Sequence, residues 1–106
     1  MSLASRLAAY ESAAVGDQIR VTLTEEGAFG ISFEQHPSPL YRHCARIRSL
    51  APGGQGDRTN RLRPGLVLVR LGANLDCTRL PTYSAVIGAV RGFSARPASL
   101  TFATAV

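Results

Sequence analysis

The stretch Gly27-Ala28-Phe29-Gly30-Ile31, followed at once by Ser32 and Phe33, decides the fold and the function that this sequence predicts. Glycine at a bend lets the main chain turn tightly and present successive N–H groups outward. Three amides directed at one point bind an anion, and a carboxylate is the natural anion where apolar side chains flank the site. A Gly-x-x-Gly segment alone is weak evidence, so its meaning depends on the segments around it.

Residues on both sides of this bend alternate between apolar and polar side chains, which is the period of a β-strand. Before the bend, Ile19, Val21 and Leu23 are separated by arginine and threonine. After it, Ile31 and Phe33 are separated by serine. The sequence therefore predicts two half-buried strands joined by a turn.

Further strands are predicted later in the chain. The segment from Ala45 to Leu50 alternates again, and the continuous apolar run at 66–69 suits a strand that is buried on both faces. A very short strand is expected at 74–76. In a final strand we expect Leu100 to point inward and Thr101 to point outward.

One helix is predicted from Thr82 to Arg91. Val86 and Val90 recur at helical spacing, the threonine that opens the segment is a suitable N-cap, and Gly92 ends it. A single helical turn could fit at 55–60. The chain is thus mostly strand, with one longer helix late in the sequence.

The length of 106 residues indicates one domain. We expect residues 1–17 to form a short amphipathic helical extension and residues 18–106 to form the domain. Apolar residues make up 45% and charged residues 18% of the chain, which is a globular balance. No apolar run predicts a transmembrane helix and no N-terminal segment resembles a signal peptide. We therefore expect a cytoplasmic protein, either free or at the inner face of the membrane.

The formal net charge is +5, and all twelve basic residues are arginine. A positive field attracts anionic lipid or nucleic acid, and such a surface would use the residues Arg46, Arg48, Arg61, Arg63 and Arg91. The arginines are spread along the chain and alternate with apolar residues, which favours solvated strand faces instead. Steep salt dependence of binding would indicate the anionic partner.

The order of these segments resembles that of a PDZ domain, from about Ile19 to Ala103. Phe29-Gly30-Ile31 resembles the carboxylate-binding loop of that family, and the segment from Asn60 to Leu68 resembles its turn into the fourth strand. The resemblance implies a mainly β (α+β) fold. It would be a partly open β-sandwich of five to six strands with two helices, to which the short N-terminal helix is added.

The resemblance also implies a protein-protein interaction module, a scaffold or adaptor. The C-terminal tail of a partner would add to the sheet in a groove between the second strand and the second helix. The amides of the loop would hold the terminal carboxylate, and apolar side chains would line the pocket for the last residue. The implied peptide-binding residues are Phe29, Gly30, Ile31, Ser32, Phe33, Tyr83, Ile87 and Val90.

Some details are particular to this chain. Tyr83 would face the ligand residue two positions before its end, and its ring and single O–H favour an apolar or acidic residue there. Glu25 and Glu26 stand where the family often has a basic residue, and the sequence leaves open whether Arg20 or another arginine compensates. The tail Thr104-Ala105-Val106 is itself similar to a ligand of the family, so self-association through it is a second expectation beside an ordinary chain end.

The sequence does not predict an enzyme or a cofactor. The two histidines, His36 and His43, lie in or beside a proline-rich segment, where a solvent-facing role is usual. Together with Cys44 and Cys77 they match no ligand spacing of a zinc site, and reduced structural thiols are expected. A regulatory module of a larger enzyme stays open as an alternative, and it too would bind peptide here.

Overall fold

Five strands form one antiparallel path in the order β1 (Gln18–Leu23), β6 (Ala98–Ala103), β4 (Val67–Leu71), β3 (Ala45–Leu50) and β2 (Ile31–Gln35), and β5 (Leu75–Asp76) pairs with β4 beside this path. The computed structural model describes residues 18–104. The helix predicted within residues 1–17, and Ala105 and Val106 of the tail, lie outside the described residues. The expectations about the N-terminal extension and about self-association therefore stay predictions.

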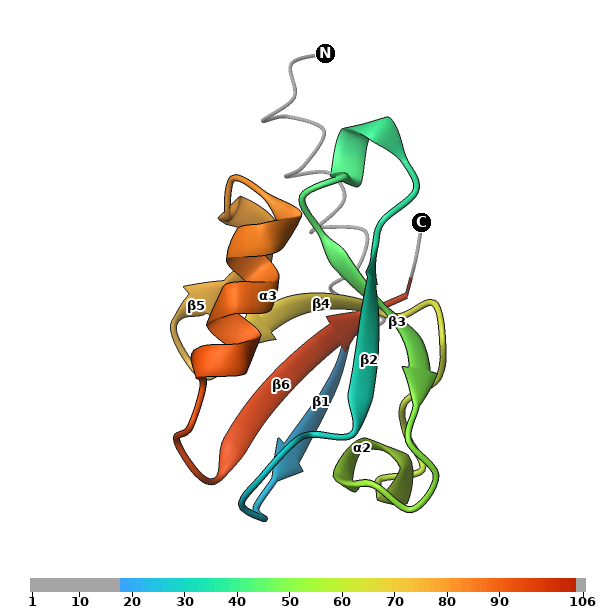
Figure 1. Ribbon diagram of the computed structural model, residues 1–106, viewed down its shortest axis with the longest axis vertical. Coiled ribbons are helices and arrows are strands. Elements are labelled where there is room, and N and C mark those ends of the chain that lie inside the picture. The colour runs from blue at the N-terminus through green and yellow to red at the C-terminus, as the bar shows by residue number, and fades with distance from the viewer. Residues whose placement is uncertain (1–17, 105–106) are drawn as a thin grey trace.

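The elements follow the predicted order along the chain (Figure 1). The strands are β1 (Gln18–Leu23), β2 (Ile31–Gln35), β3 (Ala45–Leu50), β4 (Val67–Leu71), β5 (Leu75–Asp76) and β6 (Ala98–Ala103). The helices are α2 (Gln55–Arg58) and α3 (Tyr83–Gly92), and single 3-10 turns occur at Pro39–Tyr41 and Cys77–Arg79. The short strand, the single helical turn and the long helix are thus all confirmed.

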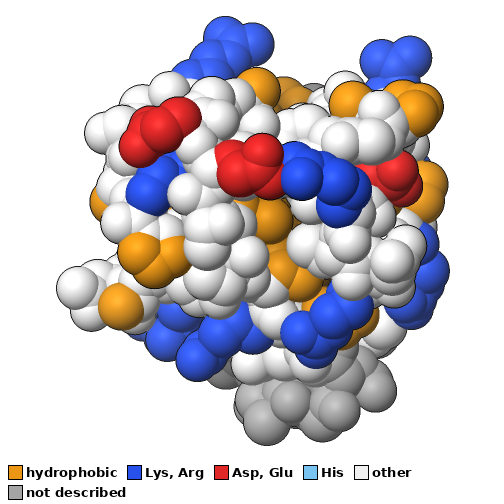
Figure 2. Space-filling model, turned by 90° about the horizontal axis from the view of Figure 1, so that it is seen from below, with side chains coloured by type: hydrophobic (Ala, Val, Ile, Leu, Met, Phe, Trp, Pro, Cys, Tyr) orange, Lys and Arg blue, Asp and Glu red, His pale blue; other side chains and the backbone are white. Residues whose placement is uncertain are grey.

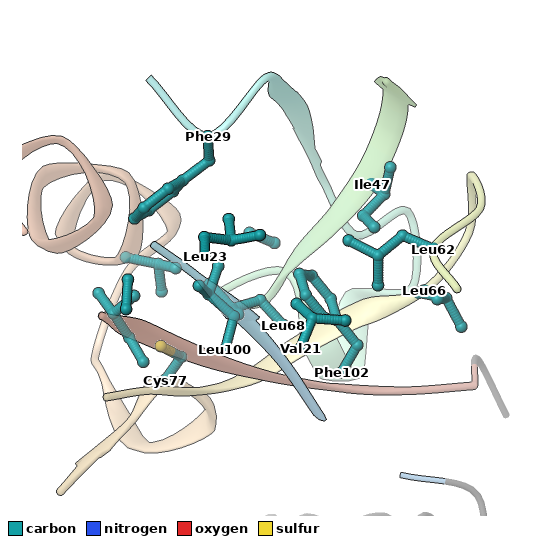
Figure 3. Packing of buried hydrophobic residues seen from close by; sticks show 14 residues of the cluster. Val21, Leu23, Phe29, Ile47, Leu62, Leu66, Leu68, Cys77, Leu100 and Phe102 are labelled. Carbon is teal, nitrogen blue, oxygen red and sulfur yellow. The ribbon is translucent and has the colours of Figure 1, made fainter. Parts of the chain in front are cut away.

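The main core fills the space between the sheet and α3. Val86 of α3 is completely buried in it, and Phe102 and Ile47 reach it from the central strands. Figure 3 shows Phe29 extending into this core from the segment before β2. The side chain of Phe29 is only 7% exposed, so the loop before β2 is anchored in the core.

The reverse face of the sheet is also covered. A second buried cluster consists of Cys44, Val67, Val69 and Ala103, with Tyr41 packed against it. The expectation that Thr101 points outward to solvent is wrong, because Thr101 is only 5% exposed. It lies on the opposite side of β6 from Leu100, as alternation requires, but that side is buried as well.

The position of β2 in the sheet prepares the candidate site. Among residues 18–104, β2 pairs with β3 on one side and has no strand partner on the other. Figure 1 shows α3 next to this unpaired margin, with α2 at the end of the molecule where β2 begins. A last strand with a free margin can accept a further strand.

Candidate functional site

A groove of about 460 Å³ lies between the start of β2 and the C-terminal end of α3. On one side it is lined by residues 27–32, and on the other by Val90, Arg91 and Phe93. Ala51 and Arg96 complete the lining. Figure 2 shows the end of the molecule that carries α2, with hydrophobic side chains exposed in a hollow that charged side chains surround.

The β1–β2 loop, residues 24–30, supplies free main-chain donors to this groove. Its carbonyl groups are used: Phe29 O accepts from the Gly56 amide at 2.9 Å, and Gly30 O accepts from the Ala51 amide at 2.9 Å. Within residues 18–104, no hydrogen bond uses the amide of Phe29 or Gly30. Gly30 has a positive φ of 73°, which turns the chain sharply at this point. The loop therefore offers adjacent N–H groups that could donate hydrogen bonds to an anion.

The register of β2 shows which of its groups face outward. Ile31 lies opposite Leu50, and the bond from Ala51 to Gly30 makes this a pair without mutual hydrogen bonds. Ile47, opposite Phe33, donates to Leu66 O and accepts from the Gly65 amide instead. The main-chain groups of Ile31 and Phe33 therefore point away from β3, toward the free margin.

The side chain of Gln55, the first residue of α2, holds the loop from one side. Its Oε1 accepts from the Glu25 amide at 3.1 Å, and its Nε2 donates to Ala28 O at 3.0 Å. Gln55 is 8% exposed, so both bonds are shielded from water. Bonds of this kind fix the main chain at the two ends of residues 25–28.

Arg96, between α3 and β6, holds the loop from the other side. Its Nε donates to Glu25 O at 2.8 Å, and its Nη2 donates to Gly27 O at 2.7 Å. Its guanidinium carbon lies 4.8 Å from the centre of the Phe29 ring, a cation–π distance. Its Nη1 donates to Ala95 O, so all three guanidinium nitrogens are used.

The electrostatics of the groove are positive. Arg91 and Arg96 line it, and no Asp or Glu is among its lining residues. The Glu25 carboxylate, which the sequence places near the loop, forms an ion pair with Arg58. Arg20 does not line the groove. Arg91 and Arg96 thus supply the positive charge that the family often has as a basic residue near the loop.

The predicted site residues divide into two groups. Those that line the groove are Phe29, Gly30, Ile31, Ser32 and Val90. Those that are partly buried against the core and are not among the lining residues are Phe33, Tyr83 and Ile87. Burial raises the pKa of Tyr83, and Arg91 opposes this shift while Glu34 adds to it.

Sequence reasoning missed four contributors: Gln55, Arg91, Phe93 and Arg96. The sequence predicts Arg91 only as part of a basic surface. Nothing local marks Gln55 or Arg96 as site residues, since the loop residues that they bind lie 27 or more positions away in the chain. Only the folded backbone brings them to the loop.

The histidines and cysteines lie away from the groove and form no metal site. Within the described residues, no group of three or more His, Cys, Asp or Glu side chains could hold a metal ion. His36 is 6% exposed, so its expected solvent-facing role is wrong, and burial, Arg46 and His43 lower its pKa. Cys44 and Cys77 are both buried, and no disulfide joins them. No helix between residues 18 and 104 has the length and hydropathy needed to cross a membrane.

Solved structures with the same fold are known. The PDZ domain of syntaxin binding protein 4 matches at a TM-score of 0.63 and 18% identity, over 85% of this chain and 84% of that domain. The PDZ domain of a human protein product matches at a TM-score of 0.61 and 17% identity, over 87% and 86%. No family model and no curated protein sequence matches the chain. The fold is therefore PDZ-like, which confirms the resemblance seen in the order of the segments.

Proposed function

We propose that this PDZ-like chain is a protein-protein interaction module that binds the C-terminal tail of a partner. The observation that carries the proposal is the combination of unused amides at Phe29 and Gly30 with the bare margin of β2 beside them. An extended peptide can use both at once, with its carboxylate on the loop and its main chain on the strand. Neither feature needs a particular side chain in the partner.

The groove offers a distinct role to each part of such a tail. The amides of Phe29, Gly30 and Ile31 would hold the carboxylate, and charge-assisted bonds of this type contribute about 1.5–3 kcal/mol each. The last side chain would enter the apolar part of the groove, where Ile31, Val90 and Phe93 lie. The preceding residues would pair with Ile31 and Phe33 as an antiparallel strand. The groove would thus select a partner mainly by its C-terminal carboxylate and by only a few of its side chains.

Selectivity upstream of the chain end would involve Tyr83 at the first position of α3. A half-buried ring favours an apolar side chain by contact, and its O–H can donate to an acidic one. Ile87, one turn later, extends the apolar side of α3. A role as scaffold, adaptor or regulatory module of a larger enzyme is compatible with this binding mode. A cytoplasmic location, free or at the inner face of the membrane, is part of the same proposal.

The experiment compares free-acid peptides with amidated twins. A library of hexapeptides with a hydrophobic last residue is titrated against the 106-residue protein, and each positive peptide is measured again as the amide. We expect amidation to abolish binding, because the amide has neither the charge nor the second acceptor oxygen. Equal binding of both twins would contradict the proposal.

The salt dependence separates this groove from a general basic surface. One carboxylate in a partly enclosed groove predicts a mild effect of salt, because few ions are displaced. Binding to anionic lipid or nucleic acid predicts a steep effect and no dependence on a peptide end. The same titrations at low and high salt, with anionic vesicles as a second probe, distinguish these partners. Deleting residues 104–106 and measuring the solution mass tests self-association.

A further inference from the structure

Three of the four interactions of Arg96 constrain the part of the β1–β2 loop that leads into the free amides, and the fourth is the bond to Ala95 O. Two of them are hydrogen bonds to carbonyl groups two residues apart, those of Glu25 and Gly27. Both carbonyls must point to one guanidinium, so the chain between them is folded back. Because the peptide unit is planar, fixing the Gly27 carbonyl also fixes the direction of the next N–H group.

The third interaction carries this constraint to the anion site. The guanidinium lies over the Phe29 ring, whose other contacts are in the core. The position of Phe29 determines where its own amide and the amide of Gly30 point. Arg96 therefore acts on the geometry of the loop from Glu25 to Phe29, whereas Gln55 holds only Glu25 and Ala28.

We infer that Arg96 is a positioning residue: its forked guanidinium holds the β1–β2 loop in the conformation that directs the Phe29 and Gly30 amides into the groove. The inference rests on the proposed function as far as a peptide carboxylate is the anion that these amides bind. The conformation of the loop, however, is a property of the protein without any ligand. The two parts can therefore be tested separately.

The planar fork distinguishes positioning from a simple effect of charge. A lysine at position 96 would keep the positive charge, but its ammonium group is a point donor that cannot match two fixed carbonyls and a ring face at once. If Arg96 acts by charge alone, Arg96→Lys retains the effect. If it acts by holding the loop, Arg96→Lys loses nearly as much as Arg96→Gln. Arg63→Gln is the matched control, because Arg63 is exposed, does not line the groove and has the same charge.

The binding experiment uses a fluorescent free-acid peptide that ends in Thr-Ala-Val, the tightest free-acid peptide from the library, and their amidated twins. We expect both Arg96 variants to bind the free acids about tenfold or more weakly, since oriented charge-assisted bonds are worth at least that much. Any residual binding of the amidated twins should change by less than about twofold, as should all binding by Arg63→Gln. An Arg96→Lys affinity close to that of the natural protein would overturn the inference, and so would an equal loss for both twins.

A measurement without ligand separates the two proposals. Backbone ¹⁵N relaxation gives order parameters for the loop, and we expect those of residues 25–30 to fall in both Arg96 variants and to stay unchanged in Arg63→Gln. If the natural protein does not distinguish free acid from amide, the proposed function fails while this measurement still decides the role of Arg96. Unchanged order parameters in Arg96→Gln would overturn the inference whatever the peptides do.

Discussion

The Gln55 side chain and the Glu25 main chain, 30 positions apart, meet through a hydrogen bond of 3.1 Å from the Glu25 amide to Oε1. The same Glu25 peptide segment gives its carbonyl to Arg96 at 2.8 Å. Glu25 is thus held through both main-chain groups while its carboxylate pairs with Arg58 at the surface. A residue whose negative charge suggested a poorer anion site is in fact a structural anchor of that site.

Replacing Gln55 by glutamate tests this anchor with almost no change of shape. The variant Gln55→Glu keeps the acceptor for the Glu25 amide, but a carboxylate oxygen then faces the Ala28 carbonyl in place of a donor. We expect a loss of about 1–3 kcal/mol in the free energy of unfolding at pH 7, the usual cost of an unmade buried hydrogen bond. Urea titration measures it. A loss that does not diminish when the introduced carboxylate is protonated at low pH would contradict this cause.

The two glycines Gly30 and Gly53 form a matched pair for substitution by alanine. Both have a φ of 73°, so alanine at either position would adopt an unfavourable positive φ, at a cost of about 1–2 kcal/mol. A Cβ at Gly30 would lie 3.2 Å from the Gly54 Cα and 3.3 Å from the Gln55 amide nitrogen, whereas a Cβ at Gly53 would meet nothing within 4 Å. We expect Gly30→Ala to be the less stable variant and the only one that weakens free-acid peptide binding. Equal effects in calorimetry and in binding would show that the close contact does not matter.

The elements of the fold were predictable because each depends on neighbouring residues. Alternation at 19–23 and the helical spacing of Val86 and Val90 are local patterns, and both elements are present. The burial of Thr101 was not predictable, because alternation tells which residues share a face and not what covers that face. The same limit applies to the site: the glycine-containing bend is visible in the sequence, whereas Arg96 reaches Gly27 across 69 positions.

His36 makes stability depend on pH near neutrality. Burial is the largest cause of its lowered pKa, followed by Arg46 and His43. The folded state therefore resists protonation of the His36 ring, whereas the same ring in the unfolded chain takes up a proton at its ordinary pKa of 6.5. The unfolded state then binds more protons below pH 6.5, and stability falls as pH decreases through that value. Urea titrations at about pH 7.5 and about pH 5.5 should show a smaller decrease for His36→Gln than for the natural protein. An identical decrease would assign the effect to other groups.

Cys77 makes a similar contribution at high pH. Burial, with the added effect of Asp76 and Cys44, raises the pKa of this thiol from 9.0 to about 12. The unfolded chain therefore loses the Cys77 proton at a lower pH than the folded protein does, and stability should fall as pH rises above 9.0. Comparing about pH 8 with about pH 10 in urea, we expect a larger loss for the natural protein than for Cys77→Ala. In the difference between the two losses, the effects of the cavity left by the substitution and of tyrosine ionisation cancel. A difference of zero would contradict the prediction.

Tyr83 offers the sharpest test of selectivity, because its ring and its hydroxyl make different predictions. Tyr83→Phe keeps the half-buried ring and removes only the O–H donor. We expect peptides with leucine two positions before the end to bind this variant as they bind the natural protein. Peptides with glutamate there should bind about three- to tenfold more weakly, the range of one hydrogen bond to a charged group that is partly exposed.

Glu34, near enough to raise the Tyr83 pKa, also repels such a glutamate, although its own carboxylate pairs with Arg46. In a Glu34→Gln background, Tyr83→Phe should therefore weaken binding of the glutamate peptide relative to the leucine peptide by the same factor, while the absolute affinity for the glutamate peptide is higher. If Tyr83→Phe leaves the affinity for the glutamate peptide unchanged in both backgrounds, a contact with the hydroxyl is excluded.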